Sequence, residues 1–286
     1  MKNLIKHISQ LTNKEFQTIH SLSGGSISSA YVLKWKEGAY FLKVNANSDA
    51  LDMFVAEKES LEAIEETDTI AVPKVHCVHV YNGKAFLLMD YIESKPANTN
   101  DYRALGTQTA KLHLNYKDKF GFTSNNFIGS LPQSNTQYTD WINFYWHQRI
   151  APQLKLAKKS KMLMSNEIIS DQTATSVFEE LLGKNVKPSI LHGDLWAGNY
   201  LIATNGTPYL IDPATYWGHS MVDIAMSKLF GGFGNEFYAA YHNIIEHPNN
   251  YNAQIDLYQL YFLLVHLNLF GRSYYGSVSS ILKRYF

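Results

Sequence analysis

Apolar and polar positions follow the short period of β-strands through the first ninety residues. The runs form two pairs, 31–35 with 39–44 and 74–81 with 84–92. Glu37-Gly38 joins the first pair, and Asn82-Gly83, a dipeptide that favours a type I′ hairpin, joins the second. The pattern predicts a small antiparallel sheet.

Residues 48–67, between the two pairs, carry their apolar positions at helical spacing. Phe54, Leu61 and Ile64 fall on one face of this predicted helix, and Glu57 falls on the same face. A carboxylate on an apolar stripe costs free energy to bury unless a cation compensates it. Glu57 therefore requires a positively charged partner from another element.

From residue 101 onward the periodicity is mainly helical, and strand-like runs occur only between about 189 and 211. Helices are predicted at 101–116, 139–164, 171–183, 220–245 and 254–270. We therefore expect an α+β protein of two lobes. A small antiparallel N-lobe with one main helix (1–91) is followed by a larger, mostly helical C-lobe (92–286), with the segment 89–96 connecting them.

Composition narrows the possible environments and partners. The 25 basic and 25 acidic side chains balance, so no overall positive field would attract nucleic acid or an anionic membrane. The single cysteine, Cys77, excludes an internal disulfide framework. The N-terminus lacks the apolar core of a signal peptide, and the longest apolar stretch, 257–270, is too short for a membrane span. We expect a cytoplasmic protein without nucleic-acid or membrane partners.

Residues 191–213, LHGDLWAGNYLIATNGTPYLIDP, concentrate the candidate chemistry. Asn199 lies five residues after Asp194, and Asp212 lies thirteen after Asn199. If the chain reverses here, Asp194 can face a substrate hydroxyl while Asn199 and Asp212 hold one cation. Magnesium bound to a nucleotide needs few protein oxygens, because phosphates and water complete its octahedron. Taken alone, the stretch is equally well a polar turn with capping roles.

Protein kinases arrange a catalytic Asp, an Asn and a metal-binding Asp in this order. Here His192-Gly193-Asp194 stands where they carry His-Arg-Asp, and Asp212-Pro213-Ala214 stands where they carry Asp-Phe-Gly. Glycine in place of arginine resembles the small-molecule kinases, in which no activation loop needs an arginine anchor.

The N-terminal part supplies the remaining nucleotide-binding elements. Lys43 ends a strand in the position of the kinase lysine that steadies the α- and β-phosphates, and it is the predicted partner of Glu57. Phe41 lies on the same strand face and can line an adenine pocket. Backbone N–H groups at Gly24-Gly25-Ser26, between two strands, can approach phosphates without obstruction by side chains.

Together these residues resemble the fructosamine kinase (ketosamine-3-kinase) family, within the aminoglycoside phosphotransferase and choline kinase-like group of the protein-kinase-like fold. The resemblance covers nearly the whole chain. It is carried by LHGDLWAGN, IDPATYWGHSMVDIAMSKLFGGF, GFTSNNFIGSLPQSNTQYTDWINFYWHQRIAPQL and LYQLYFLLVHLNLFGRSYYGSV. Two positions depart from the family: Ser26, where members often carry cysteine, and Met221, where they usually carry glutamate.

The resemblance implies an alcohol phosphotransferase that uses ATP and Mg²⁺ to phosphorylate the 3-hydroxyl of ketosamines. The product is unstable and releases the free amine, which is a deglycation repair activity. The acceptor would be a small ketosamine or a glycated lysine on a protein. By motif position, the resemblance implies that Asp194 is the general base and that Asn199 and Asp212 are magnesium ligands. It also implies that Lys43 and Glu57 form the pair that positions the phosphates. Gly24, Gly25 and Ser26 would form a loop over ATP, and backbone groups of Asp90 and Ile92 would contact adenine.

Three functional hypotheses remain open from the sequence. Besides a ketosamine kinase, the chain could be a kinase of an aminoglycoside- or choline-like alcohol, or a non-catalytic binding protein on a kinase scaffold. The last usually lacks a catalytic Lys, Asp or Asn, and none is missing here. Trp196 either stacks on the sugar of the acceptor or packs between the lobes.

Overall fold

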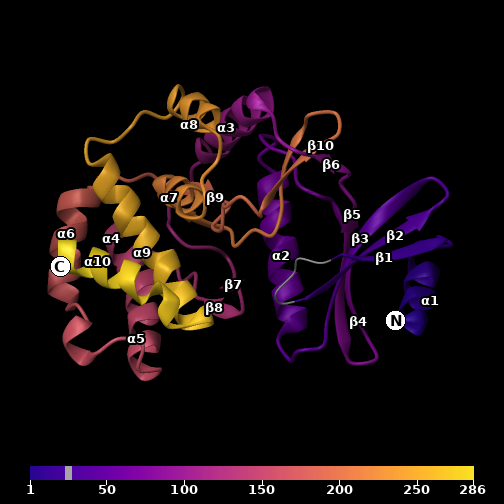
Figure 1. The fold of residues 1–286 in the computed structure, drawn as a ribbon, viewed down its shortest axis with the longest axis horizontal. Helices are drawn as coiled ribbons and strands as arrows, with labels where there is room; N and C mark the ends of the chain where they lie inside the picture. The colour runs from indigo at the N-terminus through magenta and orange to yellow at the C-terminus, as the bar shows by residue number, and fades with distance from the viewer. Residues whose placement is uncertain (23–27) are drawn as a thin grey trace.

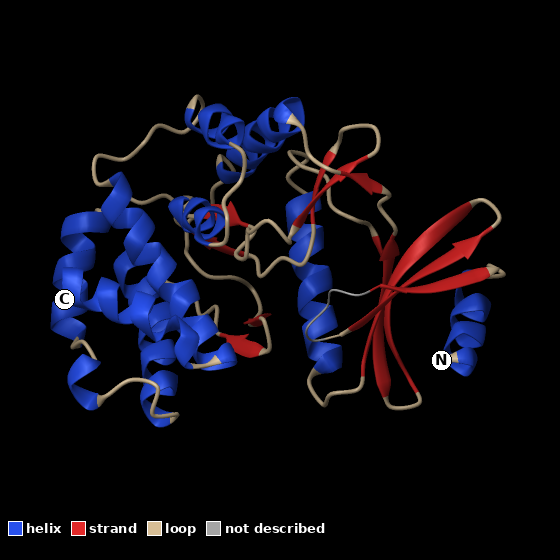
Figure 2. Ribbon diagram, in the orientation of Figure 1, coloured by secondary structure: helices blue, strands red, loops and turns tan. Residues whose placement is uncertain are grey.

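The computed structural model describes residues 1–22 and 28–286. Within these residues a five-stranded antiparallel sheet, in the order β1-β2-β3-β5-β4, occupies one part of the molecule, and most helices occupy the other (Figures 1 and 2). The strands are β1 (Thr18–Leu22), β2 (Ser29–Trp35), β3 (Gly38–Asn45), β4 (Val75–Tyr81) and β5 (Lys84–Asp90). The sheet and the hairpin at Asn82-Gly83 confirm the predicted α+β class.

One helix covers each face of this sheet (Figure 1). Alternate strand residues such as Leu42 and Phe86 pack against α1 (Lys2–Thr12), where His7 also stacks on Tyr81 at a ring distance of 4.4 Å. The residues between them, such as Leu87, join the core under α2 (Ala50–Glu65). Because neighbouring strand residues face opposite sides, Lys43 points toward α2 and its Glu57.

The core under α2 continues into the helical part of the molecule, where the remaining helices surround it. They are α3 (Thr99–His113), α4 (Trp141–Tyr145), α5 (Ala151–Lys159), α6 (Asp171–Leu182), α7 (Met221–Leu229), α8 (Asn235–His242), α9 (Tyr251–Phe270) and α10 (Tyr275–Tyr285). A π-helical turn, Trp146–Ile150, joins α4 to α5, and 3₁₀ turns lie at Ser165–Glu167 and Arg272–Tyr274. None of the helices in the described ranges combines the length and apolar character needed to cross a bilayer.

Two helix predictions need correction. The predicted helix 220–245 is divided into α7 and α8, because Gly231 and Gly232 adopt φ angles of +87° and +72°, which end an α-helix. The predicted helix 139–164 is interrupted by the π-helical turn and stops at Lys159. The helix α10 was not predicted, and neither was α1.

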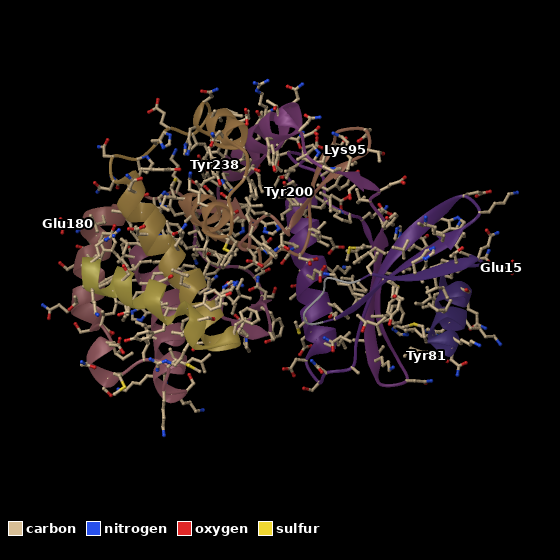
Figure 3. The ribbon with its side chains drawn as sticks, viewed as in Figure 1. Glu15, Tyr81, Lys95, Glu180, Tyr200 and Tyr238 are labelled. Carbon is tan, nitrogen blue, oxygen red and sulfur yellow. The ribbon has the colours of Figure 1, made fainter. Side chains whose placement is uncertain are left out.

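Short strands link the two parts of the molecule. The strand β6 (Ser94–Lys95) lies within the connecting segment 89–96 and pairs with β10 (Tyr200–Ala203), which pairs with β11 (Pro208–Leu210). Lys95 and Tyr200 mark this region (Figure 3). The strand β9 (Ser189–Leu191) pairs with β12 (Tyr216–Gly218), and β7 (Asn126–Ile128) pairs with β8 (Leu131–Gln133). These pairings hold residues 191–216 between the sheet and the helices, while a domain boundary between residues 91 and 92 stays a prediction.

Gly106 sits where α3 crosses α8. A Cβ atom at this position would lie 2.2 Å from the backbone oxygen of Phe237 in α8. Gly276 in α10 also lies in a helix, but a Cβ atom there would meet nothing within 4 Å. The two glycines therefore separate intrinsic helix propensity from packing.

We expect Gly106→Ala to lower the free energy of unfolding by roughly 1–3 kcal/mol, because α8 must move to admit the methyl group. The control Gly276→Ala should raise it by about 0.5–1 kcal/mol, because alanine favours helix. Urea unfolding followed by circular dichroism measures both changes. Equal effects of the two substitutions would contradict the close approach of α3 and α8.

Candidate active site

The loop between β9 and β10 is held by a carboxylate at the start of α7. The backbone N–H groups of His192 and Gly193 donate to the two oxygens of Asp223, at 2.7 and 2.9 Å. Asp223 is fully buried, and His113 Nε2 donates to it from α3 at 3.1 Å. Asp223 thus anchors the backbone of this loop at the two residues that immediately precede Asp194.

Gly193 is required at its position by the backbone. Its φ angle is +83°, and a Cβ atom would lie 2.1 Å from the oxygen of Ala214. This close approach lets the Ala214 N–H donate to the oxygen of His192 at 2.8 Å. An arginine, which stands at this position in protein kinases, is therefore excluded here by local packing.

The imidazole of His192 joins the same two segments. Its Nε2 donates to the carbonyl of Ile211 at 2.9 Å, and its Nδ1 accepts from the N–H of Asp194 at 3.2 Å. Burial lowers the pKa of His192, although the nearby carboxylates oppose the shift. A neutral ring meets this pattern of one donor and one acceptor. His192 thereby sets the distance between the loop of Asp194 and the segment of Asp212.

Asp194 carries a partly buried carboxyl group. Burial raises its pKa to about 7, the charges of Asp212 and Asp223 add to the rise, and a hydrogen bond from Asn199 opposes it. Asn199 Nδ2 donates to the backbone oxygen of Asp194 at 2.8 Å and to its Oδ2 at 3.1 Å. A carboxylate held in this way, with a pKa near neutrality, can accept a proton from a bound hydroxyl.

Lys43 connects three separate elements. Its Nζ lies 2.7 Å from Glu57 Oε1 on α2, and this is the ion pair that the sequence predicts. It also lies 2.5 Å from Oδ1 of Asp212, a contact that was not predicted. Burial alone would lower the pKa of Lys43, but the two carboxylates outweigh it and raise the pKa. For Glu57, burial raises the pKa while Lys43 opposes the rise.

The oxygen atoms at Asn199 and Asp212 suit a hard cation. The amide nitrogen of Asn199 is bonded to Asp194, which leaves Oδ1 as its acceptor atom. The Asp212 side chain is 47% exposed and lines the cavity. Among the described residues, no three His, Cys, Asp or Glu side chains could hold a metal ion by themselves. The donor set therefore fits Mg²⁺ that brings its remaining ligands from nucleotide phosphates and water.

A cavity of about 670 Å³ gathers most of the predicted residues, and this volume is typical of small-molecule sites. The predicted residues that line it are Phe41, Lys43, Glu57, Asp194, Trp196, Asn199 and Asp212. Gly24, Gly25 and Ser26 lie outside the described residues.

Asp90 and Ile92 are absent from the described lining of this cavity. The N–H of Asp90 donates to the carbonyl of Lys74 at 3.0 Å, so this N–H is already engaged within the protein. The adenine contacts of Asp90 and Ile92 therefore stay predictions.

A network of buried amides supports the segment after Asp212, and sequence reasoning assigned it no role. Asn126 Nδ2 donates to the carbonyl of Thr215 at 2.9 Å, and Gln133 Nε2 donates to Asn126 Oδ1 at 2.8 Å. Tyr261 donates its hydroxyl to Gln133 Oε1 at 2.5 Å. Gln133 belongs to the Pro-Gln-Ser-Asn stretch that carried part of the family resemblance, and this was the available signal.

Arg149 holds the end of the same stretch. It is fully buried, donates to Asn135 Oδ1 and to the carbonyl of Ser134, both at 2.6 Å, and lies 3.9 Å from the ring centre of Tyr216. Arg149 thus joins the β8 loop to the strand that follows the Asp212 segment.

Comparison with known proteins identifies the chain. The family model described as fructosamine kinase matches residues 1–286. The chain belongs to the fructosamine kinase family. Its relatives include the ketosamine-3-kinase of Mus musculus, which is 34% identical over an alignment of 300 residues. The alignment covers 93% of this chain and 94% of the mouse protein. Another is the chloroplastic protein-ribulosamine 3-kinase of Arabidopsis thaliana, which is 38% identical over 274 residues. This match covers 93% of this chain and 82% of the Arabidopsis protein.

Solved structures agree with this assignment. A crystal structure from Thermobifida fusca, described as a fructosamine-3-kinase, superposes with a TM-score of 0.88 at 28% identity and covers 99% of this chain and 98% of its own. The aminoglycoside phosphotransferase APH(4)-Ia superposes with a TM-score of 0.63 at 14% identity, and the match covers 99% of this chain and 98% of APH(4)-Ia. The likeness to APH(4)-Ia shows only that the two proteins share a fold. This fructosamine kinase family member is an ATP-using phosphotransferase with the protein-kinase-like α+β fold.

The Lys43 contacts predict the effect of removing Glu57. Glu57→Ala should lower kcat/KM for ATP by about 10-fold or more, because Lys43 loses a carboxylate that orients it toward phosphate. Glu62→Ala is the matched control, since Glu62 lies on the same helix and pairs only with the exposed Lys58. Steady-state kinetics at saturating Mg²⁺ measure both, and identical ATP kinetics in the Glu57 variant and the wild type would reject the role.

Proposed function

We propose that this family member transfers the γ-phosphoryl group of Mg-ATP to the 3-hydroxyl of ketosamines, the rearranged adducts of sugars with amines. The observation that carries the proposal is the partly buried carboxylate of Asp194, which faces the same cavity as the Lys43–Glu57 pair and Asp212. Membership in the fructosamine kinase family supports the choice of acceptor. Small ketosamines and glycated lysines on proteins both present the required hydroxyl.

In the proposed reaction, Asp194 accepts the proton of the acceptor hydroxyl. That oxygen forms its bond to the γ-phosphorus while the bond from this phosphorus to the bridging oxygen of ADP breaks. The transition state is loose, so positioning and charge neutralisation provide most of the rate enhancement. Lys43, oriented by Glu57, holds the phosphates, and Asn199 and Asp212 hold the ion. Mg²⁺, when bound with ATP, supplies neutralisation of the phosphate charge.

The acceptor end of the cavity has a candidate sugar platform. Trp196 follows Asp194 by two residues, is 38% exposed and lines the cavity. An indole at this position can stack on the apolar face of a sugar. Phosphorylation of the 3-hydroxyl makes the adduct labile, so release of the amine would follow and the activity would reverse glycation.

Substitution of the two aspartates should separate chemistry from nucleotide binding. Asp194→Asn should retain Mg-ATP binding and lose on the order of 100-fold or more in turnover, because the amide cannot accept the proton. Asp212→Asn should also weaken Mg-ATP binding, because an ion ligand loses its charge. Calorimetric titration with a non-hydrolysable ATP analogue and steady-state rates give the two readouts. Weakened nucleotide binding in both variants alike would contradict the separate roles.

The acceptor itself is tested by incubating the protein and Mg-ATP with fructosyl-lysine or ribulosyl-lysine, with choline and kanamycin as comparison alcohols. We expect ADP formation and a mass gain of one phosphate on the ketosamine, both lost in Asp194→Asn. Turnover on choline or kanamycin without any phosphorylated ketosamine would assign the enzyme to another class of small-molecule kinase.

A further inference from the structure

The cavity continues beyond Asp194 along one face of α9. Phe262, Val265, His266, Leu269 and Phe270 line it at the 3–4-residue spacing of a helix face. The end of α9 lies beside the β7–β8 hairpin (Figure 1), where the side chain of Leu269 approaches Gly129. These five residues of α9 form what we call the α9 wall. It lies on the acceptor side of the cavity, because Trp196 reaches it through Phe230 at a ring distance of 6.5 Å.

The α9 wall offers no cation. Among the described residues that line the cavity, the charged side chains are Lys43, Glu57, Asp194 and Asp212. The ammonium group of Lys43 already contacts both Glu57 and Asp212. An anionic group on the acceptor would therefore lose water at this wall without gaining a charged partner, which is costly.

His266 presents a hydrogen-bond acceptor rather than a donor. Its Nδ1 lies 2.8 Å from the carbonyl oxygen of Phe262, and because a carbonyl only accepts, Nδ1 carries the hydrogen. Burial lowers the pKa of His266, although the carbonyl opposes the shift, and this favours the neutral ring. In that ring Nε2 holds a lone pair. Such an atom stabilises an N–H donor and repels a carboxylate oxygen.

Aromatic rings surround the imidazole of His266. The ring centres of Phe230, Tyr274 and Phe270 lie 4.6, 5.1 and 5.4 Å from it. Faces of aromatic rings are electronegative, so they attract ammonium groups and disfavour anions. The ketosamine nitrogen is a secondary amine that is protonated near neutral pH. The wall and the imidazole therefore favour the same charge.

We propose that the α9 wall selects acceptors by the charge of their amine part, admitting the secondary ammonium and excluding a carboxylate bonded next to it. The inference rests on the proposed ketosamine kinase function. In an α-glycated amino acid the carboxylate is one carbon from the nitrogen, so it meets the wall. A glycated alkylamine, or a glycated lysine side chain within a polypeptide, brings no such anion.

A matched pair of substrates tests this selection. Fructosyl-valine and fructosyl-isobutylamine share their sugar and carbon skeleton and differ only in the carboxylate. We expect kcat/KM for fructosyl-valine to be lower than that for fructosyl-isobutylamine by about 10-fold or more, because a desolvated and unpartnered charge provides strong discrimination. Rates are measured at saturating Mg-ATP through ADP formation and confirmed by the mass of the phosphorylated adduct.

A substitution in the α9 wall tests whether the selection against the carboxylate occurs there. Phe270 is 57% exposed at the end of α9, so Phe270→Arg adds a cation without disturbing the core. It should raise kcat/KM for fructosyl-valine relative to fructosyl-isobutylamine by about 5-fold or more. Phe270→Leu is the control, because it removes the ring without adding charge and should not favour the valine adduct. The ATP KM of each variant reports whether the nucleotide side of the cavity is intact.

Three results would overturn the inference. Equal kcat/KM for the two adducts in the wild type would refute the selection while leaving the ketosamine kinase function standing. An unchanged ratio in Phe270→Arg would refute the assignment to the α9 wall. Phosphorylation of choline or kanamycin but of neither adduct would overturn both this inference and the proposed function.

Discussion

The arrangement of the site depends on the ammonium group of Lys43. It joins β3, α2 and the segment after β11 by contacting Glu57 and Asp212 together. Charges removed from water are tolerated only when they compensate each other. One ammonium between two carboxylates leaves the cluster with a net negative charge, which suits the arrival of a divalent cation with a nucleotide. The lysine therefore holds β3, α2 and the Asp212 segment together beside the cavity, where we propose that the phosphates and the ion bind.

Backbone hydrogen bonds fix the catalytic loop against the Asp212 segment. Asp223 accepts two N–H groups of the loop, and His192 bonds to the carbonyl of Ile211 across the gap. Gly193 permits this approach, since any side chain would overlap the oxygen of Ala214. Buried amides from the β7–β8 hairpin hold the other side of the segment. The acidic side chains consequently project from rigid backbone, as transfer through a loose transition state requires.

The cavity has two chemically different ends. One end carries the described charged side chains, whereas the other is the aromatic and aliphatic face of α9 around His266. The aminoglycoside phosphotransferase APH(4)-Ia shares the fold of this chain. The face of α9 is where members of this fold can differ, because a helix face can change its side chains without altering the backbone that holds Asp194. Substrate choice can thus vary while phosphoryl transfer remains the same.

The sequence by itself determined the strand pairs, most helices, the Asp194–Asn199–Asp212 spacing and the Lys43–Glu57 pair. These follow from local periodicity, or from a charge on an apolar face that can be stable only with a partner. Only the tertiary structure decided that Lys43 also contacts Asp212, that Gly193 is required by Ala214, and that α9 lines the cavity. Periodicity reports that a residue is buried but not which distant segment covers it. The helix α9 is apolar on most of its surface, so its pattern does not distinguish the face that packs in the core from the face that borders the cavity.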